Sequence, residues 1–138
     1  MRAMTEVEIT VRTTVNPTED PAKVETAIRN LLGDIPLRNE SQGDSAVIEG
    51  SLSGLEALEP FRDALSRARI RDAARSLLTR IAQDSLISFG LNKQAAFAGQ
   101  ASFHGSGESP LGPIQLTIRG DTDVIIGFLC GSGSKRRF

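Results

Sequence analysis

Apolar and polar positions alternate near the N-terminus of this 138-residue chain. The apolar side of the pattern consists of Val7, Ile9, Val11, Thr13 and Val15, with polar residues between them. A period of two with many β-branched residues predicts a strand that buries one face and leaves the other in water. The Asn-Pro pair at 16–17 ends the pattern.

A helical period follows. Thr18 is placed to cap a helix, Glu19 and Asp20 suit the positive end of its dipole, and Pro21 is tolerated in its first turn. The apolar stripe of this helix consists of Val24, Ala27, Ile28, Leu31 and Leu32. We predict that the helix ends at Gly33. Thr18, Glu19, Asp20 and Lys23 also form a small polar cluster, for which helix capping is the simpler interpretation.

The middle of the chain predicts a loop, a strand and a helical region. Residues 34–44 read as a loop, and residues 46–52 as a strand in which Gly50 marks a bulge or the close approach of another backbone. A helical pattern then runs to about Asp84. It contains two apolar stripes separated at 66–69, so we expect two helices or one bent helix, with Ser66 as a candidate cap.

The last third of the chain is richer in strand patterns. We predict strands at 86–92, 99–104 and 115–119, with a short helical turn at 95–98 and a glycine- and proline-rich hairpin connection at 105–113. The apolar run at 123–130 fits both a strand and a helix capped by Asp121 or Thr122. Together these patterns predict one α+β domain over residues 1–130, followed by a flexible basic tail at 131–138.

Composition narrows the chemistry. Cys130 is the only cysteine and His104 the only histidine, so the chain has no intramolecular disulfide, and we predict neither a metal site nor a cofactor. No nucleophile–histidine–carboxylate set can be assembled, and we therefore predict no enzymatic activity. An enzyme acting on a phosphate-bearing substrate is the remaining alternative. No apolar run reaches membrane-spanning length, and we predict a cytoplasmic protein.

Charge is distributed unevenly along the chain. The first 61 residues hold 11 acidic and 5 basic side chains, whereas residues 62–138 hold 6 acidic and 11 basic ones. Arg67, Arg71 and Arg75 follow a spacing of four and would line one flank of a continuous helix. Arginine binds phosphate through its planar fork, which favours contact with RNA. A solvated helix face with Asp63–Arg67 and Asp72–Arg75 pairs is the competing interpretation.

Three consecutive polar residues close the strand predicted at 86–92. The amides of Asn92 and Gln94 both donate and accept hydrogen bonds, and Lys93 between them suits a phosphate. At an exposed tip they would form an RNA-binding site. The alternative is structural, with Asn92 capping the short helical turn and Gln94 bonding to backbone.

Four segments taken together resemble a known family: PTEDPAKV at 17–24, RIRDAAR at 69–75, NKQAA at 92–96 and SPLGPI at 109–114. The chain is similar to an archaeal family of unknown function that is labelled a predicted exosome subunit or RNA-binding protein. The resemblance implies a fold like that of the ribosomal protein that holds the small RNA of the large subunit. It therefore implies a mostly antiparallel sheet of about five strands with helices packed on one face.

These observations predict a non-catalytic RNA-binding protein of the archaeal cytosol with a link to RNA processing. The predicted RNA-binding residues are Asn92, Lys93, Gln94, Arg67, Arg71 and Arg75. The alternative is a protein–protein interaction module or a homodimeric accessory subunit, joined through the apolar run at 124–129.

Overall fold

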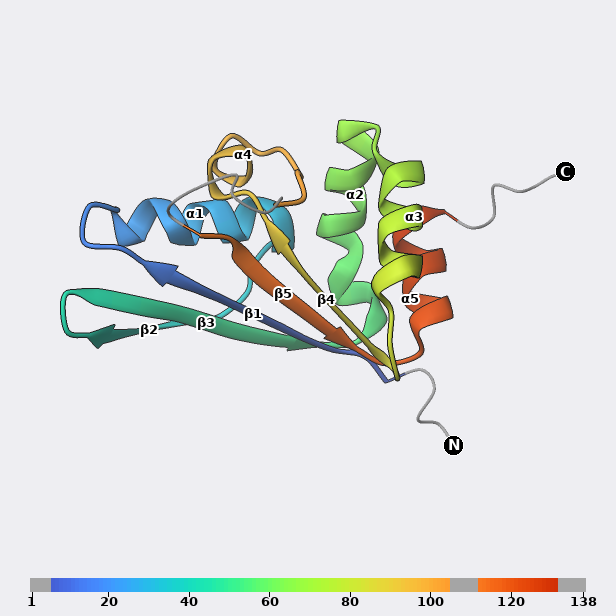
Figure 1. Cartoon of the computed structure of the whole chain (residues 1–138), viewed down its shortest axis with the longest axis horizontal. Coiled ribbons are helices and arrows are strands. Elements are labelled where there is room, and N and C mark those ends of the chain that lie inside the picture. The colour runs from blue at the N-terminus through green and yellow to red at the C-terminus, as the bar shows by residue number, and fades with distance from the viewer. Residues whose placement is uncertain (1–5, 105–111, 132–138) are drawn as a thin grey trace, which may run out of the picture.

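A five-stranded sheet and one layer of helices make up residues 6–104 and 112–131, the parts of the chain that the computed structural model describes (Figure 1). The strands are β1 (Glu8–Val15), β2 (Leu37–Gln42), β3 (Ser45–Ser53), β4 (Leu86–Leu91) and β5 (Ile114–Arg119). The helices are α1 (Pro21–Leu32), α2 (Glu59–Ala68), α3 (Arg71–Ile81), α4 (Lys93–Phe97) and α5 (Thr122–Cys130), with a 3-10 turn, η2 (Leu55–Leu58), before α2. The predicted α+β class is confirmed.

The sheet has the strand order β2-β3-β1-β5-β4, and every neighbouring pair is antiparallel. β1 lies at its centre, where Val11 pairs with Gly50 of β3 and Leu116 of β5. Exposed and buried residues alternate along the whole of β1, as its sequence pattern predicts. A central strand with this alternation leaves one face of the sheet uncovered.

All the helices stand on the same face of the sheet, with α1 and α4 over one end and α2, α3 and α5 over the other (Figure 1). The core lies between the two layers, and its largest fully buried residues include Ile9, Ile28, Ile48, Phe61, Leu65, Leu78 and Ile87. The uncovered face of β1 carries Glu8, Thr10, Arg12 and Thr14. The prediction of helices packed on one face of an antiparallel sheet is confirmed.

The N-cap of the first helix lies two residues later than predicted. Asp20, not Thr18, is the N-cap of α1, and its Oδ1 accepts a hydrogen bond from the Ala22 N–H at 3.0 Å. Pro21 at the first helical position explains the choice, because proline fits there and the residue before it is driven into extended backbone. The predicted apolar stripe is buried and Gly33 ends the helix, as expected.

The loop predicted at 34–44 is wrong, because Leu37–Gln42 forms the edge strand β2 and pairs with β3. Its sequence, LRNESQ, is mostly polar and gives no apolar alternation. An edge strand on a sheet with one open face needs little burial, so backbone pairing alone defines it. The close approach predicted at Gly50 is confirmed, since a Cβ there would lie 2.5 Å from the Pro36 carbonyl oxygen.

The helical region divides into two helices, as expected, but Ser66 does not cap the second. Ser66 lies inside α2, which ends at Arg69 in left-handed backbone with φ of 60°. Ile70 then occupies the N-cap of α3, where its side chain has no hydrogen-bonding group to offer. The turn is made by backbone geometry, which helical periodicity does not report.

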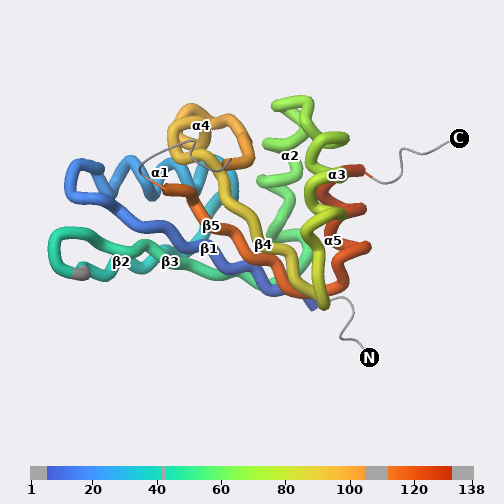
Figure 2. The backbone as a smooth tube through the Cα atoms, in the orientation of Figure 1, coloured from blue at the N-terminus to red at the C-terminus, as the bar shows by residue number. Residues whose placement is uncertain are grey.

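The last third differs from the prediction in one segment. The strand predicted at 99–104 does not form. This segment meets β4 through a single bridge between Phe103 and Leu91, because α4 returns the chain beside the end of that strand. The ambiguous run at 123–130 is helical, capped by Asp121. Figure 2 follows the chain from β4 through α4. Most of the predicted 105–113 connection and nearly all of the tail at 131–138 lie outside the described residues.

Candidate nucleic-acid interface

Six arginines lie on α2, α3 and the junction between them: Arg62, Arg67, Arg69, Arg71, Arg75 and Arg80. The predicted flank of Arg67, Arg71 and Arg75 assumed one continuous helix, and that assumption is wrong. The break at Arg69 leaves Arg67 on α2 and the other two on α3. Arg67, Arg69 and Arg71 instead come within five residues of one another around the junction, and we call these three the junction arginines.

The junction contains a shallow hollow of about 260 Å³, lined by Ser66, Arg69, Arg71 and Asp72. The three junction arginines are exposed, and none forms an ion pair with a carboxylate in the described parts of the chain. The expected Asp63–Arg67 and Asp72–Arg75 pairs are likewise not formed there. On the open sheet face, by contrast, Arg12 and Arg38 pair with Glu49 at 2.6 Å and 3.0 Å.

Two of the remaining arginines, Arg75 and Arg62, contact α5. Arg75 is half-buried, and its Nη2 donates to the Cys130 carbonyl oxygen at 2.9 Å, the favourable position for a cation at a helix C-terminus. Arg62 lies over the ring of Phe128 at 4.5 Å. Arg71 also passes close to α5, because a Cβ at Gly131 would stand 2.7 Å from its Nη1. Arg75 therefore has a structural role. Arg71 also approaches the end of α5, but its side chain is exposed.

The predicted polar tip divides into three different environments. Asn92 is the N-cap of α4, and its Oδ1 accepts a hydrogen bond from the Ala95 N–H at 2.8 Å. This is the structural alternative that the sequence left open. Gln94 is exposed at the surface of α4. The two amides therefore do not act as one exposed unit.

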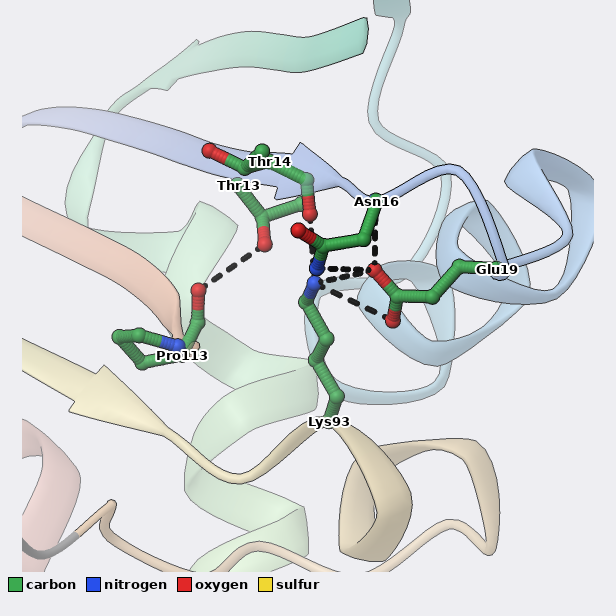
Figure 3. A network of polar contacts seen from close by, with 6 residues as sticks. All are labelled: Thr13, Thr14, Asn16, Glu19, Lys93 and Pro113. Atoms are coloured by element: carbon green, nitrogen blue, oxygen red, sulfur yellow. Dashed lines mark hydrogen bonds and ion pairs between the residues drawn. The ribbon is translucent and has the colours of Figure 1, made fainter. Parts of the chain in front are cut away.

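Lys93 is buried, with 6% of its surface exposed, so the expectation of a free cation at the tip is wrong. Its Nζ donates to the Thr14 carbonyl oxygen at 2.5 Å and to Glu19 Oε1 and Oε2 at 2.9 Å and 3.2 Å (Figure 3). Asn16 donates its backbone N–H and its side-chain amide to Glu19 Oε1, both at 2.9 Å. This network joins the end of β1 to α4, and it withdraws Lys93 from solvent.

The ionisation of Glu19 reflects these contacts. Burial alone raises the pKa of its carboxyl, but the hydrogen bonds from Asn16 and Lys93 and the charge of Lys93 outweigh burial and hold the pKa below its ordinary value. Glu19 therefore carries a negative charge at neutral pH and neutralises Lys93. Lys93 lies 74 positions after Glu19 in the chain, and no local spacing indicates the pair.

A second hollow, of about 350 Å³, has this ion pair in its lining. Its lining comes from the start of α1 and from α4: Thr18, Glu19, Asp20, Lys23, Val24, Ala27, Lys93, Gln94 and Phe97. Lys23 Nζ lies 5.9 Å from the centroid of the Phe97 ring. The polar cluster predicted at 18–23 thus lines a surface hollow as well as serving the helix start, and Phe97 is a residue that sequence reasoning missed.

The other candidate chemistry is sparse. No group of three or more His, Cys, Asp or Glu is placed to hold a metal ion within residues 6–104 and 112–131. Cys130 is a buried free thiol, and burial raises its pKa although Arg75 and Arg71 oppose the shift. None of the helices in the described segments is both long and apolar enough to cross a membrane.

The apolar run at 124–129 is largely used inside the molecule. Ile125, Ile126 and Leu129 are buried in α5 against the core, and Val124 is the exposed member, at 41%. A homodimer interface through this run would therefore have one exposed aliphatic side chain, Val124, and the half-buried Phe128 available to it.

The fold and these surfaces define the class: a single α+β domain with an open antiparallel sheet and a cationic helix junction. A family model described as RNA binding matches residues 8–120. The chain belongs to this family, the archaeal UPF0201 proteins.

Relatives in the family share much of the sequence and of the fold. A UPF0201 protein of Sulfurisphaera tokodaii is 39% identical over 130 residues, covering 93% of this chain and 90% of its own length. One from Aeropyrum pernix is 40% identical over 114 residues, covering 81% and 76%. The crystal structure of the UPF0201 protein from Methanococcus jannaschii superposes with a TM-score of 0.80 at 30% identity, covering 89% of this chain and 98% of that one.

Proposed function

We propose that this protein binds RNA without catalysing a reaction on it, and that the junction arginines make the main phosphate contacts. The observation that carries the proposal is the contrast between two surfaces. Arg67, Arg69 and Arg71 are exposed without carboxylate partners in the described chain, whereas the sheet-face Arg12 and Arg38 are already paired with Glu49. A guanidinium without a carboxylate partner can bind a phosphate without first breaking an ion pair.

Two further features support the junction as a phosphate-binding surface. Guanidinium groups match phosphate oxygens with a planar fork, so a group of arginines is better suited to RNA backbone than lysines would be. Within the described residues no side chain caps the first turn of α3, and the positive end of its dipole lies beside Arg69 and Arg71, although the Asp72 carboxylate in that turn offsets part of the charge. The match to a family model described as RNA binding agrees with this choice of ligand.

The test is a salt titration of RNA binding by the parent and by an Arg67→Ala, Arg69→Ala, Arg71→Ala variant. The probe is a fluorescently labelled RNA of mixed sequence that contains a stem and a single-stranded loop. We expect binding by the parent to weaken as salt rises. The log–log slope should fall by roughly one unit for each arginine removed, because each releases about one counterion fewer.

A matched control removes the same charge from the opposite face. Arg12→Ala, Arg38→Ala, Arg119→Ala strips three exposed arginines from the open sheet face, where each residue shares its side with the exposed positions of β1. This control should keep most of the affinity and slope of the parent. Equal losses in both variants would show a diffuse charge effect and refute the junction, and an unchanged slope in the junction variant would refute it as well.

The same surface also suggests the cellular role that we propose. A phosphate-binding surface without a catalytic constellation suits an accessory role in RNA processing in the archaeal cytosol, where a lone buried thiol such as Cys130 stays reduced. The alternative of a protein–protein module through 124–129 has less support, because most of that run is buried within this chain.

A further inference from the structure

The hollow beside Phe97 combines features that the junction lacks. Phe97 is 46% exposed, and with Val124 it is one of two exposed large hydrophobic residues in the described part of the chain. The other described phenylalanines are buried or partly buried, and the ring of Phe89 contacts those of Phe61 and Phe103. An aromatic ring at the wall of a hollow is placed to contact a flat ligand.

Phe97 is exposed because α4 is held in a fixed orientation. Ala96 is fully buried, and Asn30 of α1 donates its amide to the carbonyl oxygens of Ala96 and Phe97 at 3.0 Å and 3.1 Å. Lys93, at the other end of this short helix, is anchored by Glu19 at 2.9 Å. The ring thus stands on a rigid support, which lowers the entropy lost when a ligand stacks on it.

The lining of the hollow matches the chemistry of a nucleobase. Val24, Ala27 and the ring of Phe97 supply apolar walls, which suit the flat faces of a base. Gln94 lies three residues before Phe97, so both fall on the same side of the helical turn, and its amide can bond to the polar edge of a base. The volume of about 350 Å³ is at the small end for ligand sites, and it suits one base better than a duplex.

The charges around the hollow favour a phosphate on one side only. Glu19 is neutralised by Lys93, which also lines the hollow, and Asp20 accepts a hydrogen bond from the first turn of α1. Lys23 is exposed beside Phe97 and has no ion pair in the described residues, so a phosphate next to the base would meet it. Figure 1 places α4 and the α2–α3 junction on the side of the helix layer that faces away from the sheet.

We propose that this hollow binds one unstacked base of a single-stranded RNA, with the base on the Phe97 ring, its edge at Gln94 and its phosphate at Lys23. The inference rests on the proposed RNA binding and adds the form of RNA: a strand with at least one unpaired base. The junction arginines supply charge, and this hollow supplies selection against fully paired RNA.

The experiment compares Phe97→Leu with the parent on one single-stranded RNA, alone and annealed to its complement. Loss of the ring should weaken single-strand binding by about 5-fold to 150-fold, the range for losing one base–aromatic stack. Binding of the duplex should not change, because its bases are already paired and stacked. The salt slope should also stay the same, since no charge is removed. Gln94→Ala should weaken single-strand binding in the same direction, and Val124→Ala on α5 serves as the matched control for an exposed apolar side chain.

The outcomes separate the two proposals. Equal binding of single-stranded RNA by Phe97→Leu and the parent, with a salt slope that depends on the junction arginines, overturns the base site and leaves the proposed function standing. An equal loss on single strand and duplex also overturns the base site. If the parent binds neither RNA at any salt concentration, both proposals fall.

Discussion

At the scale of single residues, Lys93 is the side chain whose environment differs most from the one expected. A lysine between two amides at the end of a strand suggests an exposed cation, yet its charge is buried against Glu19 and the Thr14 carbonyl. A buried ion pair adds little net stability to a protein. Removing one partner is costly, however, because the other charge then stays buried without compensation. Its substitution therefore tests folding before it tests RNA binding.

We predict that Lys93→Met lowers the free energy of unfolding by about 3 kcal/mol, the lower part of the range for a broken buried pair. The charge of Glu19 would then lack its partner, with only 10% of its side chain exposed. The Lys93→Met, Glu19→Gln double variant should recover much of that loss, because no buried charge remains. Urea unfolding of the parent and the two variants measures both values. A single variant as stable as the parent would show that the pair has no structural role.

At the scale of elements, the junction between α2 and α3 places an arginine in left-handed backbone. Arg69 adopts left-handed backbone with φ of 60° at the position after a helix where glycine is the common residue. A residue with a side chain is strained there by roughly 1–2 kcal/mol. Arg69 also lines the junction hollow, so its guanidinium offers a functional reason for keeping a strained position.

Arg69→Gly should therefore separate stability from binding. We expect the melting temperature to rise, with a gain of about 0.5–1 kcal/mol in unfolding free energy, because glycine adopts this backbone without strain. RNA affinity should fall at the same time, and the salt slope should decrease by roughly one unit. Thermal melting and RNA titration on the same protein sample provide the two readings. A stabilised variant with unchanged RNA affinity would remove Arg69 from the interface.

At the scale of the whole molecule, the Glu19 network connects parts that are far apart in the sequence. Thr14 belongs to the end of β1, Asn16 directly follows that strand, Glu19 precedes α1, and Lys93 belongs to α4 (Figure 3). The pKa of Glu19 is below its ordinary value in the folded protein, so the unfolded chain takes up a proton at higher pH than the folded chain does. Stability from this group is therefore present above the ordinary value and decreases in acid.

We predict that the parent loses stability as pH falls below about 4.5, the ordinary value for this carboxyl. The loss due to Glu19 should be complete once the pH is below its folded-state pKa. The Lys93→Met, Glu19→Gln double variant lacks this titration, so its stability should depend less on pH in that range. Urea unfolding at a series of acidic pH values compares the two slopes. Parallel curves for the parent and the double variant would contradict the prediction.

Much of the fold follows from local physics that one sequence displays. The alternation of β1, the apolar stripe of α1 and the end of α1 at Gly33 each depend on residues within one element, and these predictions are confirmed. The edge strand β2 and the segment at 99–104 were predicted wrongly. Whether such a segment becomes a strand depends on pairing with a neighbouring strand, and its own side chains give little indication of that pairing.

For the candidate site, the sequence by itself determined which residue types were available: a cluster of arginines, two amides and few aromatic rings. Only the tertiary structure decided which of them reach solvent. The backbone turn at Arg69 separated Arg67 from Arg75, and the fold brought Glu19 to Lys93 across 74 positions. It also left Phe97 exposed beside Lys23. Exposure and charge pairing depend on contacts between elements, and local periodicity carries no information on those contacts.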